Sequence, residues 1–392
     1  MILAGLSSAV FFSICTTWVT NLYLLLACVF LIRGSFNMQF VASFVHMSSE
    51  VFVATGMEIV GPSKRMMTGV AVNLFWSVGN MILALVAYLV RDWKTRQLVV
   101  SIPGIIFAYM FFLPESPRWQ ITKGKNKLAK TTILKLAKCN KVEMSEETLE
   151  TVTCVDEPTE RFWELLKSPI MRRRMAVICF NWFATGMGFY GLSMNVTNLS
   201  GNVYLNFFLF VVVEACSYAL CALFISRIGR RKMLCGTMLM AGTACIAAFI
   251  PFFVEKTSNK WIITALACFG NSCVSAGFAT VYVFTAEVVP TTTRNFGMGL
   301  GSVFARCGSM LSPYINDLTM HISGKYSQIL PMLIFGGIIM LAGLLALLLP
   351  ETFNNRLPET VKDAEQLGTK AFEERNADTQ LLAETHYQHT KL

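Results

Sequence analysis

The chain has 392 residues, of which 54% are hydrophobic and only 15% are charged, and its mean hydropathy is +0.53. A soluble domain is roughly half apolar and a quarter charged, so this composition excludes an ordinary soluble protein and indicates an integral membrane protein. The net charge of +9 does not indicate a nucleic-acid partner, because the Lys and Arg residues lie in loops between apolar blocks.

Apolar runs long enough to cross the bilayer as helices of about 20 residues recur along the whole chain. They predict ten transmembrane helices at residues 2–19, 22–45, 66–90, 97–113, 174–194, 203–225, 232–253, 261–284, 296–315 and 329–349. Most of the basic loops between these runs fall on one side of the membrane, which the positive-inside rule assigns to the cytosol. We therefore expect both termini in the cytosol.

The segments between and after the spans divide the chain further. Residues 1–113 form a helical bundle of four spans, 114–173 a cytosolic loop, 174–350 a bundle of six spans, and 351–392 a polar tail that we expect to be disordered. In the loop, "NKLAKTTILKLAK" has the spacing of an amphipathic helix.

Neither cysteines nor nucleotide motifs indicate a cofactor. The twelve Cys residues lie mostly in or beside apolar spans, and none has the spacing of a metal site, so we interpret them as small packing residues. The soluble segments contain no P-loop, which argues against an ATP-driven pump. We expect no catalytic residues, metal or cofactor.

The two halves of the chain repeat each other. "EIVGPSKR" from Glu58 and "EVVPTTTR" from Glu287 both place an Arg seven residues after the Glu, and they lie 229 residues apart. "LPESPRW" from Leu113 and "LPETF" from Leu349 form a second pair, 236 residues apart. Parallel repeats of this kind are typical of the major facilitator architecture, with six spans in each half.

Five motifs taken in order carry a family resemblance: "MEIVGPSKR", "FLPESPRW", "ISRIGRRK", "VYVFTAEVVPTTTRNFGMG" and "LLLPETF". Together they resemble the solute carrier family 22 of organic-ion transporters within the major facilitator superfamily. The resemblance implies an all-α fold of twelve helices, so we expect the first two helices to be absent, and it leaves about seven extra residues near 46–56. It also implies a plasma-membrane secondary transporter that is not an enzyme. Its partners would be the lipid bilayer, a small organic ion and a coupling ion such as Na⁺ or H⁺.

Charges near the cytosolic ends of the helices resemble the family's gating residues. Ion pairs between helices there would lock the inner mouth of the transporter, and their breakage would permit rocking. Positive-inside placement alone remains the simpler explanation for the basic members. The predicted gating charges are Glu58, Arg65, Arg227, Arg230, Arg231, Glu287 and Arg294.

Aromatic residues recur in the spans that should line a substrate cavity. Trp182 and Phe189 are seven residues apart and Phe278 and Tyr282 are four apart, so each pair shares a helix face. Such faces suit flat solutes and quaternary ammonium groups, although ordinary core packing would also explain them. These four residues and Tyr190 match the substrate cavity that the resemblance implies.

Arg306 lies about 15 Å from either end of its predicted helix. A charge there costs roughly 2.5–3.5 kcal/mol, so it should face a wet cavity or a carboxylate. Glu214 could be its counter-ion, a counter-ion for a cationic substrate, or a structural carboxylate. Tyr218 follows Glu214 by four residues and so shares its helix face. By resemblance, Arg306 together with Tyr218 is most similar to the carnitine/zwitterion branch, in which Arg306 would receive a carboxylate.

Three other functions stay open from the sequence. The substrate could be an organic anion, or the chain could be a truncated isoform without transport activity. A signalling receptor of about seven helices is the third, but ten spans and a six-span repeat argue against it. The short glycine spacing at 297–302 does not indicate a dinucleotide site, because no strand precedes it. Gly301, Ala305, Gly308 and Ser312 instead follow one another at i, i+4, i+7 and i+11, a stripe of small residues that predicts close helix packing.

Overall fold

The computed structural model describes residues 2–32, 65–103, 120, 125–139, 162–195, 202–250, 260–290, 293–321, 330–353, 355, 358 and 360–369. These residues form helices and connecting turns, with no strand among them. The chain divides into two compact units, Met1–Glu157 and Pro158–Leu392. The division falls inside the loop predicted over 114–173.

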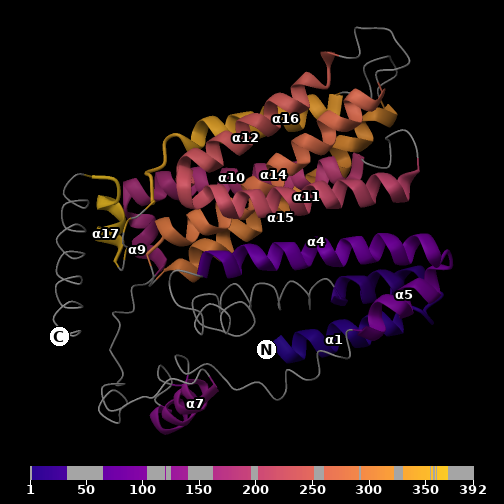
Figure 1. Ribbon diagram of the computed structural model, residues 1–392, viewed down its shortest axis with the longest axis horizontal. Coiled ribbons are helices and arrows are strands. Elements are labelled where there is room, and N and C mark those ends of the chain that lie inside the picture. Colours follow the sequence, from indigo (N-terminus) through magenta and orange to yellow (C-terminus); the bar gives the residue numbers. More distant parts are fainter. Residues whose placement is uncertain are drawn as a thin grey trace. The chain divides into compact units, whose positions relative to one another are not determined.

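The first unit contains α1 (Ile2–Cys15), an apolar helix at Leu22–Ile32, α4 (Arg65–Leu89), α5 (Trp93–Ser101) and α7 (Asn126–Cys139) (Figure 1). Asp92 caps α5 by accepting a hydrogen bond from the Thr95 backbone at 2.9 Å. The side chain of Gln97 donates to Ser13 Oγ at 2.6 Å, which ties α5 to α1. Helix α7 coincides with the amphipathic helix predicted in the loop.

The second unit contains eight named helices among its described residues: α9 (Phe162–Lys167), α10 (Pro169–Asn195), α11 (Val203–Ile228), α12 (Arg230–Ala247), α14 (Lys260–Val288), α15 (Arg294–His321), α16 (Leu330–Ala346) and α17 (Val361–Gln366). The six long ones, α10, α11, α12, α14, α15 and α16, lie side by side as a bundle (Figure 1). Helix α10 begins five residues before the predicted span at 174–194, with Pro169 in its first turn and Ser168 accepting a hydrogen bond from the Met171 backbone at 3.2 Å.

Small residues bring α10 and α15 into close contact. A Cβ added at Gly186 of α10 would overlap the Ala305 backbone of α15, and one at Gly308 would overlap the Phe183 backbone. Ser312 donates to the Met187 carbonyl at 2.9 Å. The predicted packing role of the stripe is confirmed at Gly308, where a Cβ would overlap the α10 backbone, and at Ser312, which bonds that backbone.

The described cysteines are free thiols, and half of them are buried in the second unit. Cys245 of α12, for example, is fully buried, and a Cβ at Gly270 of α14 would lie 3.2 Å from its sulfur. This placement agrees with the interpretation of cysteine as a small packing residue.

Within the described residues, three helical stretches are long and apolar enough to cross a membrane: Pro169–Met194, Val203–Ile225 and Ile262–Val288. Shorter apolar helices occupy Leu22–Ile32, Asn73–Leu89 and Leu330–Ala346. Helix α12 is less apolar because it begins with Arg230, Arg231 and Lys232, but it coincides in position with a predicted span. Predicted span residues 33–45 and 104–113 lie outside the described residues.

The polar tail is predicted to be disordered, and the structure contradicts this for residues 361–366. Helix α17 begins with a capping box in which Thr360 and Asp363 bond each other's backbone N–H. The Arg174 guanidinium of α10 donates to the Ala364 carbonyl and, at 3.0 Å, to the Leu367 carbonyl, at the end of α17. Six residues have little helical stability of their own, so these tertiary contacts hold the helix, and no periodic pattern marks them in the sequence.

Candidate functional site

Arg306 lies near the middle of α15, and its side chain is half-buried. Its guanidinium donates to the Tyr190 hydroxyl of α10 at 3.5 Å, a long hydrogen bond, and interacts electrostatically with Tyr282 of α14. Three helices therefore meet at this charge. No ion pair between Arg306 and Glu214 is found among the described residues, and the role of Glu214 as a counter-ion stays a prediction.

The predicted aromatic residues form one cluster, which we call the aromatic cluster: Trp182, Phe189 and Tyr190 of α10 with Phe278 and Tyr282 of α14. The Trp182 ring meets Tyr282 edge-on, with centroids 4.2 Å apart, and Phe278 lies 5.2 Å from Tyr282. Phe189 is 6.0 Å from Phe278 and 5.3 Å from Tyr190. The sequence predicted this grouping from separate helix faces, and the structure brings the five rings together.

Burial separates the aromatic cluster into two layers. Trp182 is fully buried and Tyr282 is 8% exposed, whereas Phe189, Tyr190 and Phe278 are half-buried, as Arg306 is. The three half-buried rings therefore form an outer layer over the two buried ones.

Trp182 is fixed from two sides. Its indole N–H donates to Thr285 Oγ1 of α14 at 2.9 Å, so its one polar atom is satisfied inside the bundle. Gly301 of α15 lies against the ring, since a Cβ there would come within 2.7 Å of Nε1. The sequence analysis predicted neither the hydrogen bond from Trp182 to Thr285 nor the packing of Gly301 against Trp182, because the sequence does not show which helices meet.

Glu214 and Tyr218 of α11 form a buried pair. Each is 3% exposed, and the Tyr218 hydroxyl donates to Glu214 Oε1 at 3.1 Å. The predicted shared face of these two residues is thus confirmed, one helical turn apart. The structure contains Glu214 as a hydrogen-bonded carboxylate, which is one of the three roles that the sequence left open. A role of Glu214 toward a ligand stays a prediction.

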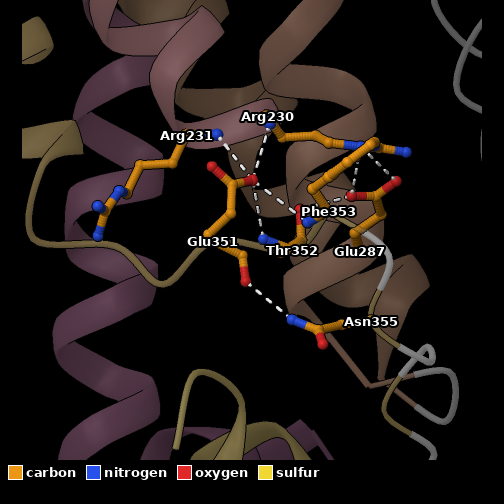
Figure 2. A network of polar contacts seen from close by, with 7 residues as sticks. All are labelled: Arg230, Arg231, Glu287, Glu351, Thr352, Phe353 and Asn355. Atoms are coloured by element: carbon orange, nitrogen blue, oxygen red, sulfur yellow. Dashed lines mark hydrogen bonds and ion pairs between the residues drawn. The ribbon is translucent and has the colours of Figure 1, made fainter. Parts of the chain in front are cut away.

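A second polar site lies where α11, α12, α14 and the segment after α16 meet, and we call it the Glu351 network: Arg230, Arg231, Glu287, Glu351, Thr352, Phe353 and Asn355 (Figure 2). The Arg230 guanidinium pairs with Glu287 at 3.1 Å and lies 4.9 Å above the Phe353 ring. The Thr352 hydroxyl donates to the same oxygen, Glu287 Oε2, at 2.5 Å. Two of the predicted gating charges therefore form an ion pair.

Glu351 is the centre of this network. Its Oε1 accepts from the backbone N–H of Arg230 at 2.8 Å, Arg231 at 3.3 Å, Thr352 at 3.1 Å and Phe353 at 3.2 Å. The first two are the free N–H groups at the start of α12, where a carboxylate is favoured by the helix dipole. Gly229 permits the approach, because its φ is +97° and a Cβ there would lie 2.8 Å from Glu351 Oε2.

Four other predicted gating charges are placed only by their position in the chain or lie outside the described residues. Arg227 is exposed near the end of α11, Arg294 begins α15, and Arg65 begins α4. Glu58 lies outside the described residues. Arg231 donates instead to the Leu349 carbonyl at 3.3 Å.

Glu351, Thr352 and Phe353 were missed as site residues, although a signal was present. The repeated "LPE" after the last span of each half marked Glu351 and Glu115 as equivalent positions. What the motif could not show is that its carboxylate turns back onto the start of α12.

Comparisons with known proteins agree with this geometry. Structures of the xylose symporter XylE from E. coli are similar in fold: one, bound to a bromodeoxyglucose, has a TM-score of 0.68 at 15% identity and covers 92% of this chain and 82% of the XylE chain. At that identity the likeness shows the fold alone, which is the predicted all-α major facilitator fold. These bundles therefore define a multi-pass membrane protein of the major facilitator class.

The family follows from sequence. Residues 1–363 match the family model described as "Sugar (and other) transporter". The "Organic cation transporter protein" of Drosophila melanogaster is 38% identical over 335 residues, covering 82% of this chain and 60% of the relative. "Solute carrier family 22 member 15-like" of Xenopus laevis is 35% identical over 339 residues, covering 85% and 67%. The chain belongs to the sugar (and other) transporter family, and within it to solute carrier family 22, as its motifs predicted.

The chain spans 60% and 58% of the lengths of the two Drosophila relatives that it matches, of which the second is an "Organic cation transporter-like protein". The matched families consist of transporters rather than enzymes.

Proposed function

We propose that this chain acts as a secondary transporter of organic ions by alternating access, and that its substrate carries both a carboxylate and a cationic group, as carnitine does. The observation that carries the proposal is Arg306, a half-buried guanidinium at mid-helix beside the half-buried rings of the aromatic cluster. Substrate, coupling ion, plasma-membrane location and cytosolic termini all belong to this proposal.

Arg306 supports recognition of the carboxylate. Its guanidinium donates a long hydrogen bond, 3.5 Å, to the neutral Tyr190 hydroxyl, and a carboxylate would match the charge of a guanidinium placed in the middle of a span. A carboxylate would bond the planar guanidinium through two parallel hydrogen bonds, which are about twice as strong as neutral ones.

The aromatic cluster supports recognition of the cationic group. Phe189, Tyr190 and Phe278 are half-buried, and the Phe189 ring centroid lies 5.3 Å from that of Tyr190 and 6.0 Å from that of Phe278. A quaternary ammonium group could therefore lie against the faces of these rings. Two relatives are named as organic cation transporters, which also favours a substrate with positive charge.

The Glu351 network supports the alternating-access part of the proposal. Arg230 and Glu287 form an ion pair between α12 and α14 that is mostly buried, at 13% and 19% side-chain exposure. An ion pair between helices stabilises one conformation of the helical bundle until the pair breaks. A gate of an alternating-access transporter requires such a contact.

The test is uptake of labelled carnitine and of a labelled aryl carboxylate by cells that express the chain. Loss of a charged hydrogen bond of about 2–3 kcal/mol predicts a 30- to 150-fold fall in carnitine uptake efficiency for Arg306→Ala. Arg306→Lys should recover part of it, since lysine keeps the charge but not the fork. Arg173→Ala, which removes an exposed arginine at the start of α10, is the matched control.

Each outcome decides between the readings. Equal carnitine uptake by the unchanged protein and Arg306→Ala would refute the role of Arg306. Preference for the aryl carboxylate would favour an organic-anion transporter. Uptake of neither substrate by the unchanged chain would contradict the transport proposal.

A further inference from the structure

Helix α7 has two faces of different chemistry, and one of them packs within the chain. Ala129 is fully buried and Thr132 is 5% exposed. The Thr132 hydroxyl donates to Gln120 Oε1 at 3.1 Å, and the Gln120 carbonyl accepts from the Lys125 backbone at 2.7 Å. Gln120 is itself only 2% exposed. This face of α7 is therefore already occupied, and only the other face is open to a partner.

The opposite face of α7 is exposed and basic. Lys127, Thr131, Leu134 and Lys138 follow one another at i, i+4, i+7 and i+11, the spacing of one helix face, and all four are exposed. Lysines flank this row on both sides. We call the set the basic face of α7: Lys127, Lys130, Thr131, Leu134, Lys135 and Lys138.

The charge of this face has a single sign. Helix α7 contains four lysines and neither Asp nor Glu, and no described carboxylate pairs with any of these lysines. Lys127 and Lys130, and likewise Lys135 and Lys138, are three residues apart, so the members of each pair repel each other on the helix surface. A face that only meets water gains from charges of mixed sign. A face of one sign instead indicates a partner of opposite charge.

Position in the chain favours a membrane surface as that partner. Helix α7 lies between the predicted spans at 97–113 and 174–194, and 13 residues separate residue 113 from Asn126. A chain of that length reaches at most about 45 Å, so the basic face stays near a bilayer and meets it at high effective concentration.

Leu134 also favours a lipid surface over a fully hydrated one. Its side chain is 46% exposed although it lies in the middle of the basic face. An apolar side chain among lysines is typical of helices that lie in the membrane interface, where the leucine enters the headgroup region and the ammonium groups meet phosphates. Lysine stems can cover apolar surface there while their charges stay in water.

We propose that the basic face of α7 binds anionic phospholipid headgroups of the membrane in which the chain is embedded. Each lysine close to an anionic bilayer strengthens binding by about five-fold, so Lys127, Lys135 and Lys138, the three exposed ones, together contribute roughly 100-fold. This contact does not depend on transport. Only its assignment to the cytosolic leaflet rests on the proposed function.

The test is hydrogen–deuterium exchange of the full chain in lipid nanodiscs, made of phosphatidylcholine alone or with about 30% phosphatidylserine. Binding to the lipid surface opposes local opening of α7, so its backbone amides should exchange about ten-fold more slowly in the anionic discs at low salt. Raising the salt to about 0.5 M should remove most of this difference, because the contact is exposed and electrostatic.

Two variants of α7 separate charge from the apolar contact. Combined replacement of Lys127, Lys135 and Lys138 by glutamine should abolish the difference between the two kinds of disc, since glutamine keeps the helix propensity but not the charge. Leu134→Ser should reduce the difference by a smaller factor.

The matched control removes the same number of charges elsewhere. Lys94 of α5, Lys167 of α9 and Lys362 of α17 are exposed lysines outside α7, and their combined replacement by glutamine should keep the full difference. A difference that persists in the α7 lysine variant, or that disappears in this control, would contradict the basic face as the lipid contact.

Other partners give different results. Equal exchange of α7 in both kinds of disc would overturn the proposal and would mean that the basic face meets water or the acidic stretch at 143–150. Basic amphipathic helices also resemble calmodulin targets. Protection by calcium-loaded calmodulin in neutral discs, with none from phosphatidylserine, would overturn the lipid contact in favour of a protein partner. Slower exchange in anionic discs without uptake of either organic ion would leave the lipid contact standing and contradict only the transport proposal.

Discussion

Replacing Glu351 by alanine tests the centre of the Glu351 network. The carboxylate oxygen that accepts four backbone N–H groups would disappear, and two of those groups, from Arg230 and Arg231, open α12. Gly229, the residue before this helix, offers no side-chain cap of its own. No other described side chain is in place to take over.

The magnitude follows from two terms. Loss of an N-terminal cap costs about 0.5–2 kcal/mol, and loss of a carboxylate at a helix N-terminus in a partly buried site costs up to about 2 kcal/mol more. We expect a loss of about 2–4 kcal/mol in the free energy of unfolding. For a unit the size of Pro158–Leu392 this corresponds to a fall of roughly 5–15 °C in the unfolding midpoint.

The assay is thermal unfolding of the purified full chain, with two further variants. Glu351→Gln keeps an acceptor oxygen but removes the charge, so it should lose about half as much stability. Glu164→Ala removes an exposed carboxylate of α9 and should change the midpoint by little. Should Glu351→Ala unfold at the same temperature as Glu164→Ala, the idea that Glu351 caps α12 would be refuted.

Two further predictions concern packing and the tail. Gly301→Ala places a methyl group against the Trp182 indole and should lower the free energy of unfolding by about 1–3 kcal/mol, measured by thermal unfolding. Gly299→Ala is the control, because a Cβ there meets nothing within 4 Å, and it should be neutral or slightly stabilising. Similar effects of the two substitutions would contradict the contact between Gly301 and Trp182. Arg174→Gln removes the guanidinium that donates to the carbonyls at the end of α17. Limited trypsin digestion should therefore cleave this variant at Lys362 faster than the unchanged protein. An unaltered cleavage rate would mean that other contacts hold the helix.

The fold was largely predictable because a bilayer imposes strong rules on sequence. A helix must supply about 20 apolar residues to cross it, and so the predicted spans at 203–225 and 261–284 coincide with α11 and α14 to within a few residues. Repeated motifs then identified the architecture and the family. Helix α17 escaped prediction because its order comes from Arg174, which is 190 residues away from Ala364 in sequence.

From helical periodicity, the candidate site was predictable only where residues share a helix; the grouping of aromatic residues from α10 and α14 came from the family resemblance. Phe278 with Tyr282, and Glu214 with Tyr218, were grouped correctly because residues four apart lie on one face. Contacts between helices were beyond reach: the hydrogen bond from Trp182 to Thr285, and the turn of Glu351 onto α12, join segments more than 100 residues apart.

By itself, the sequence of this protein determined that it spans a membrane with helices, that its halves repeat, and to which family it belongs. These properties depend on composition and on local periodicity, which one chain segment can carry alone. Only the tertiary structure decided that Arg306 donates to Tyr190 and that the Glu351 carboxylate turns back onto the start of α12. Partners of this kind are chosen by the packing of separate helices, in which the position of each side chain depends on the rest of the bundle.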